Sequence, residues 1–203
     1  MPEDSTPAHQ NTTFPSGSGE AHGYLALPTS GSGPGVIVIQ EWWGLTDHIA
    51  EVADRLAAEG FVALAPDLYG GKTAHDAVTS GNVGAVGFCM GGGFVLLLAA
   101  QQGDKIGAAV PFYGVGPAVP KVFAGITAAV QGHYGERDEF YPAADARAQE
   151  QQIRSESGAP VEFHFYDAAH AFHNDTNALG TYSEGDANTA WNRTVAFLKA
   201  HVT

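Results

Sequence analysis

The chain has 203 residues, of which 44% are hydrophobic. This is enough to bury one substantial core, so we expect a single domain over residues 1–203, with the first eleven residues loosely held. The 22 acidic and nine basic side chains give a net charge of −13, which repels the phosphates of nucleic acids and anionic lipid surfaces. We therefore expect neither nucleic acid nor a membrane as a partner.

Cysteine content and hydropathy further restrict the class of protein to which the chain can belong. The single cysteine excludes an internal disulfide. No stretch reaches the roughly 18 consecutive apolar residues that a membrane span needs, and the N-terminus lacks a basic segment followed by an apolar run. We expect a cytoplasmic protein that is a monomer or a small homo-oligomer.

In chain order, the sequence first predicts a β-hairpin formed by residues 12–14 and 21–27. Strands and helices then alternate. The expected strands are residues 35–40, 61–65, 83–88, 108–113, 128–134 and 161–166, and the expected helices are residues 47–60, 90–102 and 142–157 and a last helix that carries Trp191, Val195 and Leu198. Asp47 is the expected N-cap of the first helix, and Gly60 is the residue expected to end it.

Continuous apolar runs such as GVIVIQ at residues 35–40 are typical of strands that are covered on both faces. Their alternation with helices predicts an α/β fold, an open and mostly parallel sheet with helices on both faces. In such sheets ligands bind beyond the carboxyl ends of the strands. Residues that directly follow a strand are therefore the first candidates for a site.

Cys89 lies at the turn between a predicted strand and an apolar helix, in the sequence Gly87-Phe88-Cys89-Met90-Gly91. A nucleophile on a sharp strand-to-helix turn needs very small side chains two positions before and two positions after it. The helix N-terminus favours a thiolate and, later in a reaction, an oxyanion. The alternative interpretation is a small buried cysteine in a purely structural glycine-rich turn.

A cysteine nucleophile needs a base, and the base needs an orienting acid. In α/β-hydrolase architecture the three follow in the order nucleophile, acid and histidine, each after a strand of the sheet. Asp138 directly follows the strand at 128–134, and His170 directly follows the strand at 161–166. The competing acids are Glu136, Glu139 and Asp167, and the competing histidines are His133, His164 and His173.

A metal site is the alternative use of the same segment, because His170 and His173 are followed by Asp175. Neither an HExxH motif nor a second ligand cluster supports it, and we expect no metal.

Two glycine-rich segments also fail to fit nucleotide-binding patterns. Residues 70–73 (GGKT) lack the preceding glycine of a phosphate-binding loop, and residues 91–93 lack the spacing of a dinucleotide fingerprint. We expect no cofactor.

The segment Gln40-Glu41-Trp42-Trp43-Gly44 follows the strand at 35–40, where this architecture supplies the second N–H group of an oxyanion hole. We expect the backbone N–H groups of Trp42 and Met90 to form this hole. Glu41 either anchors the loop through hydrogen bonds or exchanges protons during turnover.

Five segments together resemble the dienelactone hydrolase family, whose members are also called carboxymethylenebutenolidases. They are residues 40–44 (QEWWG), 65–69 (APDLY), 87–92 (GFCMGG), 132–138 (GHYGERD) and 170–172 (HAF). The resemblance implies an α/β-hydrolase fold, no cofactor and a triad of Cys89, His170 and Asp138, with Glu41 taking the thiol proton when substrate arrives. The residues that we expect to contact the substrate are Trp43, Tyr134, Phe172 and His173.

Two features depart from the pattern of this family. Only residues 70–82 join the strand at 61–65 to the strand at 83–88, where the family has a longer crossover with a helix, and we expect at most one or two helical turns there. The family also holds a substrate carboxylate with arginines, whereas His173 and Asn174 follow the histidine here. With Lys72 and His173 as the remaining cationic candidates, we expect uncharged substrates to be preferred.

These observations predict a hydrolase that opens lactones or cleaves small carboxylic esters through a cysteinyl acyl-enzyme. Its expected partner is a small-molecule ester or lactone. The alternative is a non-catalytic relative, in which the shortened crossover has destroyed the pocket and the fold serves in binding or as a scaffold.

Overall fold

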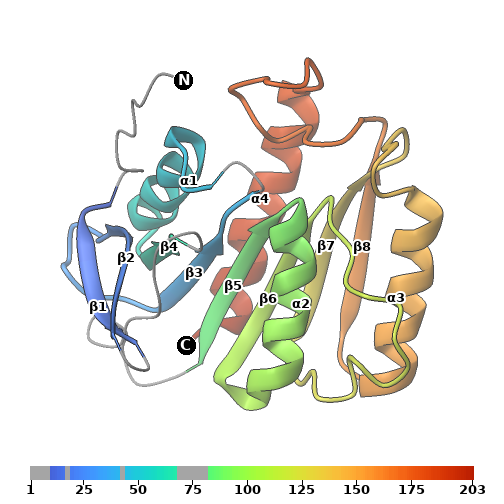
Figure 1. Ribbon diagram of the computed structural model, residues 1–203, viewed down its shortest axis with the longest axis horizontal. Coiled ribbons are helices and arrows are strands. Elements are labelled where there is room, and N and C mark those ends of the chain that lie inside the picture. The colour runs from blue at the N-terminus through green and yellow to red at the C-terminus, as the bar shows by residue number, and fades with distance from the viewer. Residues whose placement is uncertain (1–9, 17–18, 42–43, 68–81) are drawn as a thin grey trace.

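The computed structural model describes residues 10–16, 19–41, 44–67 and 82–203. Within these ranges the chain forms an eight-stranded sheet with the order β1-β2-β4-β3-β5-β6-β7-β8 (Figure 1). The strands are β1 (Thr12–Ser16), β2 (Gly19–Ala26), β3 (Gly35–Ile39), β4 (Val62–Pro66), β5 (Val83–Phe88), β6 (Ile106–Phe112), β7 (Ala129–Gly135) and β8 (Val161–Tyr166). β1, β2 and β4 pair antiparallel, and every neighbouring pair from β4 to β8 is parallel.

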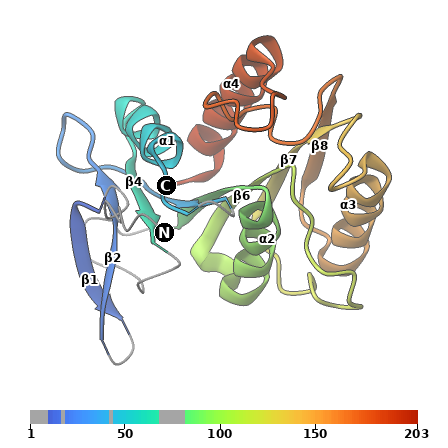
Figure 2. The same cartoon turned by 45° about the horizontal axis from the view of Figure 1, so that its top comes forward.

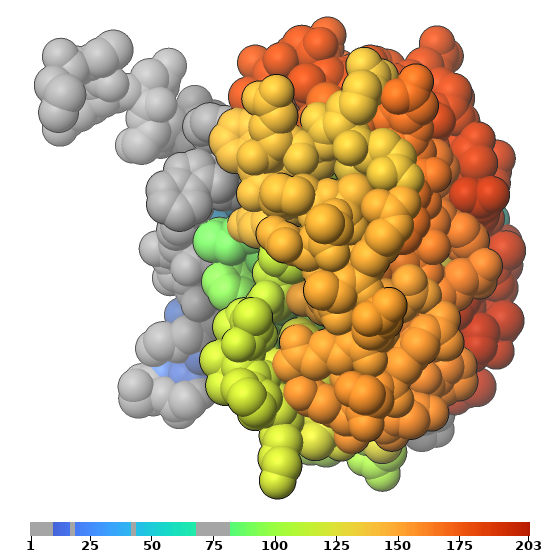
Figure 3. All heavy atoms as spheres, turned by 90° about the vertical axis from the view of Figure 1, so that its right-hand side faces the viewer, coloured from blue at the N-terminus to red at the C-terminus, as the bar shows by residue number. Residues whose placement is uncertain are grey.

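Helices cover both faces of this sheet. α1 (Asp47–Ala58) and α4 (Glu184–His201) lie on one side, and α2 (Met90–Gln102) and α3 (Ala143–Ser157) lie on the other (Figure 2). A short 3₁₀ helix, η1 (Gly103–Lys105), follows α2. At the β8 edge, α3 covers much of the surface (Figure 3). The arrangement confirms the predicted α/β fold.

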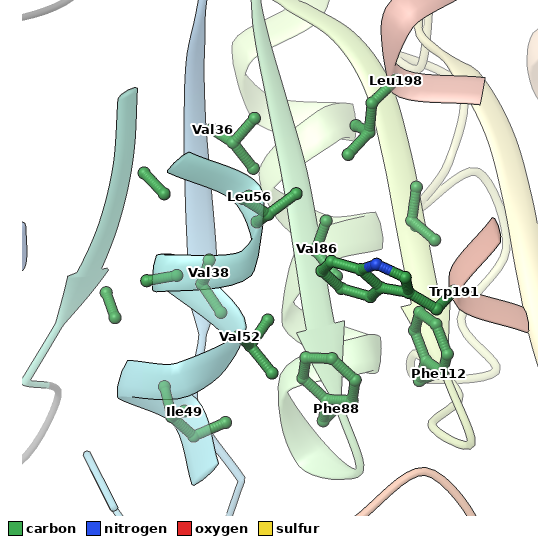
Figure 4. Packing of buried hydrophobic residues seen from close by; sticks show 14 of the residues in the cluster. Val36, Val38, Ile49, Val52, Leu56, Val86, Phe88, Phe112, Trp191 and Leu198 are labelled. Carbon is green, nitrogen blue, oxygen red and sulfur yellow. The ribbon is translucent and has the colours of Figure 1, made fainter. Parts of the chain in front are cut away.

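The two faces bury separate hydrophobic clusters because successive side chains of a strand point to opposite sides. Val86 of β5 belongs to the cluster under α1 and α4, whereas its neighbour Ala85 belongs to the cluster under α2 and α3. On the first face, Trp191 of α4 packs over Val86 and Phe112 (Figure 4). Burial on both faces explains why β3, β5 and β6 are continuously apolar in sequence.

The ends of two predicted segments differ from expectation. Thr46, not Asp47, occupies the N-cap position of α1, and Asp47 lies in the first turn, where its negative charge suits the positive end of the helix. Residues 10 and 11 are not loose. Gln10 donates a hydrogen bond to Asp67, and Asn11 exchanges side-chain hydrogen bonds with the backbone of Leu25 on β2.

The predicted short crossover falls at residues 70–82, of which only Asn82 lies within the described residues. The strand that follows it behaves as predicted, because β5 pairs in parallel with both β3 and β6. In the described part of the chain, no helix is long and apolar enough to cross a membrane.

Candidate active site

Five polar side chains come from the carboxyl ends of neighbouring strands. Glu41 follows β3, Cys89 follows β5 and Tyr113 follows β6, while Asp138 and His170 lie in the loops after β7 and β8. Because β3, β5, β6, β7 and β8 are parallel, these ends meet at one edge of the sheet, the upper edge in Figure 1. This edge contains the candidate active site.

The backbone at Cys89 is strained in the manner of a nucleophile elbow, with φ 52° and ψ −124°. A Cβ atom at position 87 would lie 2.2 Å from the carbonyl oxygen of Gly91, and one at position 91 would lie 2.6 Å from the carbonyl oxygen of Gln40. Only glycine fits at either position. The structure thus supplies the steric reason for the small residues that the sequence places on both sides of Cys89.

Cys89, His170 and Asp138 form a continuous chain of contacts. His170 Nε2 lies 3.2 Å from Cys89 Sγ, and His170 Nδ1 lies 2.8 Å from Asp138 Oδ2. Asp138 Oδ1 accepts hydrogen bonds from the backbone N–H groups of Phe140 and Tyr141, both at 2.8 Å. The acid is therefore held from two sides, and the imidazole lies between it and the sulfur.

The electrostatic environment of His170 favours its protonated form. Burial acts to lower its pKa, but the hydrogen bonds and charge interactions with Asp138 and Cys89 outweigh burial and raise the pKa to about 9. The same imidazole can therefore stabilise a thiolate at neutral pH and supply a proton to a leaving group.

The competing acids are engaged elsewhere or exposed. Glu136 pairs with Arg147, and Asp167 pairs with Arg137 on the surface. Glu139 is exposed, next to a buried Asp138. Of the four acids considered, Asp138 is the one that contacts His170.

The competing histidines lie away from the sulfur. His133 is fully buried between the hydroxyls of Tyr166 and Thr194, and burial lowers its pKa well below the usual range. His164 stacks on His133 with ring centroids 5.4 Å apart. Both therefore belong to the packing between β7, β8 and α4.

Glu41 is buried, and each of its carboxylate oxygens accepts a hydrogen bond. Tyr113 donates its hydroxyl to Oε1 at 3.1 Å, and Asn174 donates Nδ2 to Oε2 at 2.8 Å. Burial and the neighbouring Glu41 raise the pKa of Tyr113 well above its usual range, so the phenol remains a donor. Tyr113 was not among the predicted site residues, although its place directly after β6 is the same signal that indicated the other candidates.

Three of the predicted substrate contacts lie within the core. Tyr134 is fully buried on the α3 face and donates its hydroxyl to the carbonyl of Gly114. Phe172 is fully buried against Tyr113 and Tyr166. His173 is also buried and stacks on Phe88. In this structure none of the three presents a surface to a substrate, because each completes the packing beneath the site.

The cationic role considered for His173 is likewise not supported. Burial, helped by His48 and Arg55, lowers the pKa of His173 to about 3, so its ring is neutral. Phe140, which the sequence analysis did not single out, lies at the surface instead. Its ring is 68% exposed and lies 4.9 Å from the ring of His170.

Of the two residues predicted to form the oxyanion hole, Met90 belongs to the described part of the chain. Met90 is the first residue of α2, so its N–H group lies at the positive end of that helix, directly after Cys89. Trp42 and Trp43 lie outside the described residues. Within the described ranges, no three histidine, cysteine or acidic side chains gather into a group that could hold a metal ion.

Comparison with known proteins extends these observations. The sequence profile of the dienelactone hydrolase family matches residues 21–79 and 72–202. The two matches overlap at 72–79, in the segment where the sequence indicates a shortened crossover. The profile thus covers nearly the whole chain and confirms the resemblance seen in the sequence.

Individual relatives agree with this. The chain is 34% identical to Protein usf of Aquifex pyrophilus, over 96% of this chain and 99% of that protein. It is 31% identical to a protein of Yersinia pestis provisionally named a carboxymethylenebutenolidase, over 94% of this chain and 87% of the other. A crystal structure of a provisionally assigned dienelactone hydrolase from Klebsiella pneumoniae is 29% identical, with a TM-score of 0.80 over 93% of this chain and 96% of that one. The chain therefore belongs to the dienelactone hydrolase family and is a carboxylic ester and lactone hydrolase.

Proposed function

We propose that this hydrolase opens lactones or cleaves small carboxylic esters through a cysteinyl acyl-enzyme formed on Cys89. The observation that carries the proposal is the chain of contacts from Cys89 Sγ through His170 to Asp138, at 3.2 Å and 2.8 Å. A strained elbow, a buried acid and an imidazole with a raised pKa are the arrangement that nucleophilic acyl transfer needs.

In the first half of the reaction, Cys89 Sγ attacks the carbonyl carbon and forms a carbon–sulfur bond. The carbonyl oxygen becomes an oxyanion, and the N–H group of Met90 at the start of α2 donates a hydrogen bond to it. As the tetrahedral intermediate collapses, the carbon–oxygen bond to the leaving group breaks. His170 donates its proton to the departing oxygen, which leaves as an alcohol or, for a lactone, stays attached to the acyl group.

In the second half, water attacks the thioester while His170 accepts one of its protons. The carbon–sulfur bond breaks, the carboxylic acid is released and the thiolate is restored beside the imidazolium. Asp138 keeps Nδ1 protonated and directed toward itself throughout, so Nε2 faces the sulfur in every step. The exposed ring of Phe140 and the partly buried ring of Tyr141 flank His170 and offer apolar surface to a substrate.

Substitution of the nucleophile tests this mechanism. Cys89→Ala is expected to lower kcat/KM for 4-nitrophenyl acetate by about 10⁴-fold or more, because triad members act as a unit. The wild-type protein, acid-quenched during turnover, is expected to carry one acetyl group by intact mass, and the variant none. Because the elbow is held by the backbone and its glycines, circular dichroism of the variant is expected to match the wild type.

Two results would overturn the proposal. Retention of most of the activity in Cys89→Ala would show that another group is the nucleophile. Failure of the folded wild-type protein to release nitrophenol from any of several small aryl esters would favour the non-catalytic alternative.

A further inference from the structure

The carboxylate of Glu41 is only 4% exposed, yet the groups that bind it are neutral. Tyr113 and Asn174 each donate one hydrogen bond to it, one to each oxygen. Neither donor carries a positive charge. Buried carboxylates are normally paired with a cation, so a carboxylate bound by two neutral donors lacks its usual partner.

The orientation of the Asn174 amide is determined by its other neighbour. Asn174 Oδ1 accepts hydrogen bonds from the hydroxyl of Thr176 at 2.6 Å and from its backbone N–H at 3.1 Å. Both are donors, so the oxygen must face Thr176 and the NH₂ group must face Glu41. Asn174 is thus built into its loop as a donor to the carboxylate.

Glu41 lies next to the reacting centre. The carbonyl of the preceding residue, Gln40, packs against Gly91 in the first turn after Cys89. The Tyr113 hydroxyl that binds Glu41 also interacts electrostatically with Cys89 and Asp138. Tyr113 itself has a strained backbone, with φ 34°, which is consistent with a side chain held in place for the site.

The lysine and arginine residues of the described chain either bind other groups or lie at the opposite edge of the sheet. Arg55 lies over Trp191, Arg137 pairs with Asp167, Arg147 with Glu136, Arg154 with Glu150, Lys199 with Glu59, and Arg193 bonds Tyr166. Lys105 precedes β6 and Lys121 binds through its backbone to Glu156 near the end of α3, both at the opposite edge of the sheet. Lys72 lies outside the described residues.

We propose that Tyr113 and Asn174 are specificity-determining positioning residues, which hold Glu41 where no lysine or arginine of the described residues pairs with it and make the site select uncharged esters and lactones. This inference rests on the cysteinyl hydrolase function proposed above. A substrate with a free carboxylate must approach a fixed negative charge in a poorly hydrated site. At short range this repulsion is expected to cost on the order of tenfold or more in kcat/KM.

A matched pair of substrates measures the effect. 3-Acetoxybenzamide and 3-acetoxybenzoate share the acetyl ester and differ only in an amide or a carboxylate on the leaving group. The wild-type protein is expected to prefer the amide by about tenfold or more in kcat/KM at low ionic strength. Both substrates form the same acetyl-enzyme and differ only in their leaving groups. Comparing the ratio of their kcat/KM values between protein variants therefore cancels the intrinsic difference in leaving-group reactivity.

Two variants change the charge at the site. Asn174→Arg places a guanidinium beside Glu41 and is expected to lower the preference for the amide by about tenfold, or to reverse it. Glu41→Gln removes the charge with almost no change of shape and is expected to reduce the preference in the same direction. This isosteric variant keeps the test open if Asn174→Arg does not fold.

A control separates a local charge from net charge. Gln101→Arg adds the same charge at an exposed position near the far end of α2, about 17 Å from its first residue at 1.5 Å per residue. Its substrate ratio is expected to equal that of the wild type. An equal rate for both substrates in the wild type, or an unchanged ratio in Glu41→Gln, would overturn this inference while leaving the mechanism at Cys89 intact. Turnover in Cys89→Ala would instead overturn the mechanism itself.

Discussion

Two histidines three residues apart, His170 and His173, lie in the loop after β8 and have opposite electrostatic environments. Both are almost completely buried, at 5% and 2% exposed. The pKa of His170 is raised to about 9, whereas that of His173 is lowered to about 3. Burial lowers both values, so burial does not account for the difference.

The difference is the partner of each ring. His170 contacts Asp138 and Cys89, and its hydrogen bonds and charge interactions with these two residues favour the imidazolium. His173 packs against the rings of Phe88 and His48, and its Nδ1 is buried with no hydrogen-bond partner among the described residues. Of the two, His170 is therefore the ring that carries a proton at neutral pH, while His173 serves as packing beneath the site.

The two rings also link stability to pH in opposite directions. The raised pKa of His170 contributes stability that is fully present below its ordinary value near 6.5 and is lost as the pH rises through about 9. The lowered pKa of His173 contributes stability that is present above 6.5 and is lost as the pH falls toward about 3. The loop after β8 is thus sensitive to pH on both sides of neutrality.

The largest effect is expected from removing the charged ring. His170→Ala is expected to lower kcat/KM for a small aryl ester by about 10⁴-fold, nearly as much as Cys89→Ala, because neither residue acts without the other. The double variant is expected to lose no more than either single variant. Steady-state kinetics on the three proteins check this, and additive losses would contradict a shared role.

A smaller effect is expected from making His170 resemble His173. Asp138→Asn removes the anion but keeps the size of the side chain, so burial then dominates and the pKa of His170 falls. In the wild type we expect kcat/KM to fall above about pH 9 as the imidazolium loses its proton. In Asp138→Asn we expect this fall in kcat/KM to begin at a lower pH, and we expect kcat/KM at its maximum to be about 10²–10⁴-fold lower than in the wild type.

Asp167→Asn is the matched control for this change. Asp167 is an exposed acid of the same region, paired with Arg137. Its pH profile is expected to follow that of the wild type. A profile of Asp138→Asn that is lower in rate but unshifted in pH would show that Asp138 does not set the pKa of His170.

The smallest effect is expected from replacing the neutral ring. His173→Phe keeps an aromatic ring stacked near Phe88 and removes a buried nitrogen without a partner. We expect kcat/KM to change by less than about tenfold and the free energy of unfolding by at most about 1–3 kcal/mol. Urea denaturation at pH 7 and pH 5 is expected to show a smaller loss of stability on acidification than in the wild type.

A loss in His173→Phe comparable to that in His170→Ala would break the comparison, since it would give both histidines a role in the chemistry. An unchanged loss of stability on acidification would show that His173 does not stay neutral because of the fold.

Much of the architecture and the candidate catalytic side chains followed from local sequence. Apolar runs separated by helical periodicity predicted the parallel strands β3, β5 and β6, because strands buried on both faces carry mostly apolar residues. Cys89 was identified from the glycines at positions 87 and 91, where the structure leaves no room for a Cβ atom. Asp138 and His170 were identified because parallel strands bring their carboxyl ends to one edge.

The sequence could not show which side chains are buried beneath that edge of the sheet, or which buried polar groups bind one another. Tyr134, Phe172 and His173 occupy the same motifs as the candidate catalytic residues, but each is buried in packing that depends on which face of the sheet its side chain meets. The hydrogen bonds of Glu41 join residues 72 and 133 positions apart in the chain. Local patterns determine secondary structure and turns through backbone sterics and apolar burial. The partners and charge states of buried polar groups are decided only by the tertiary packing, because they depend on contacts between distant segments in a site from which water is largely excluded.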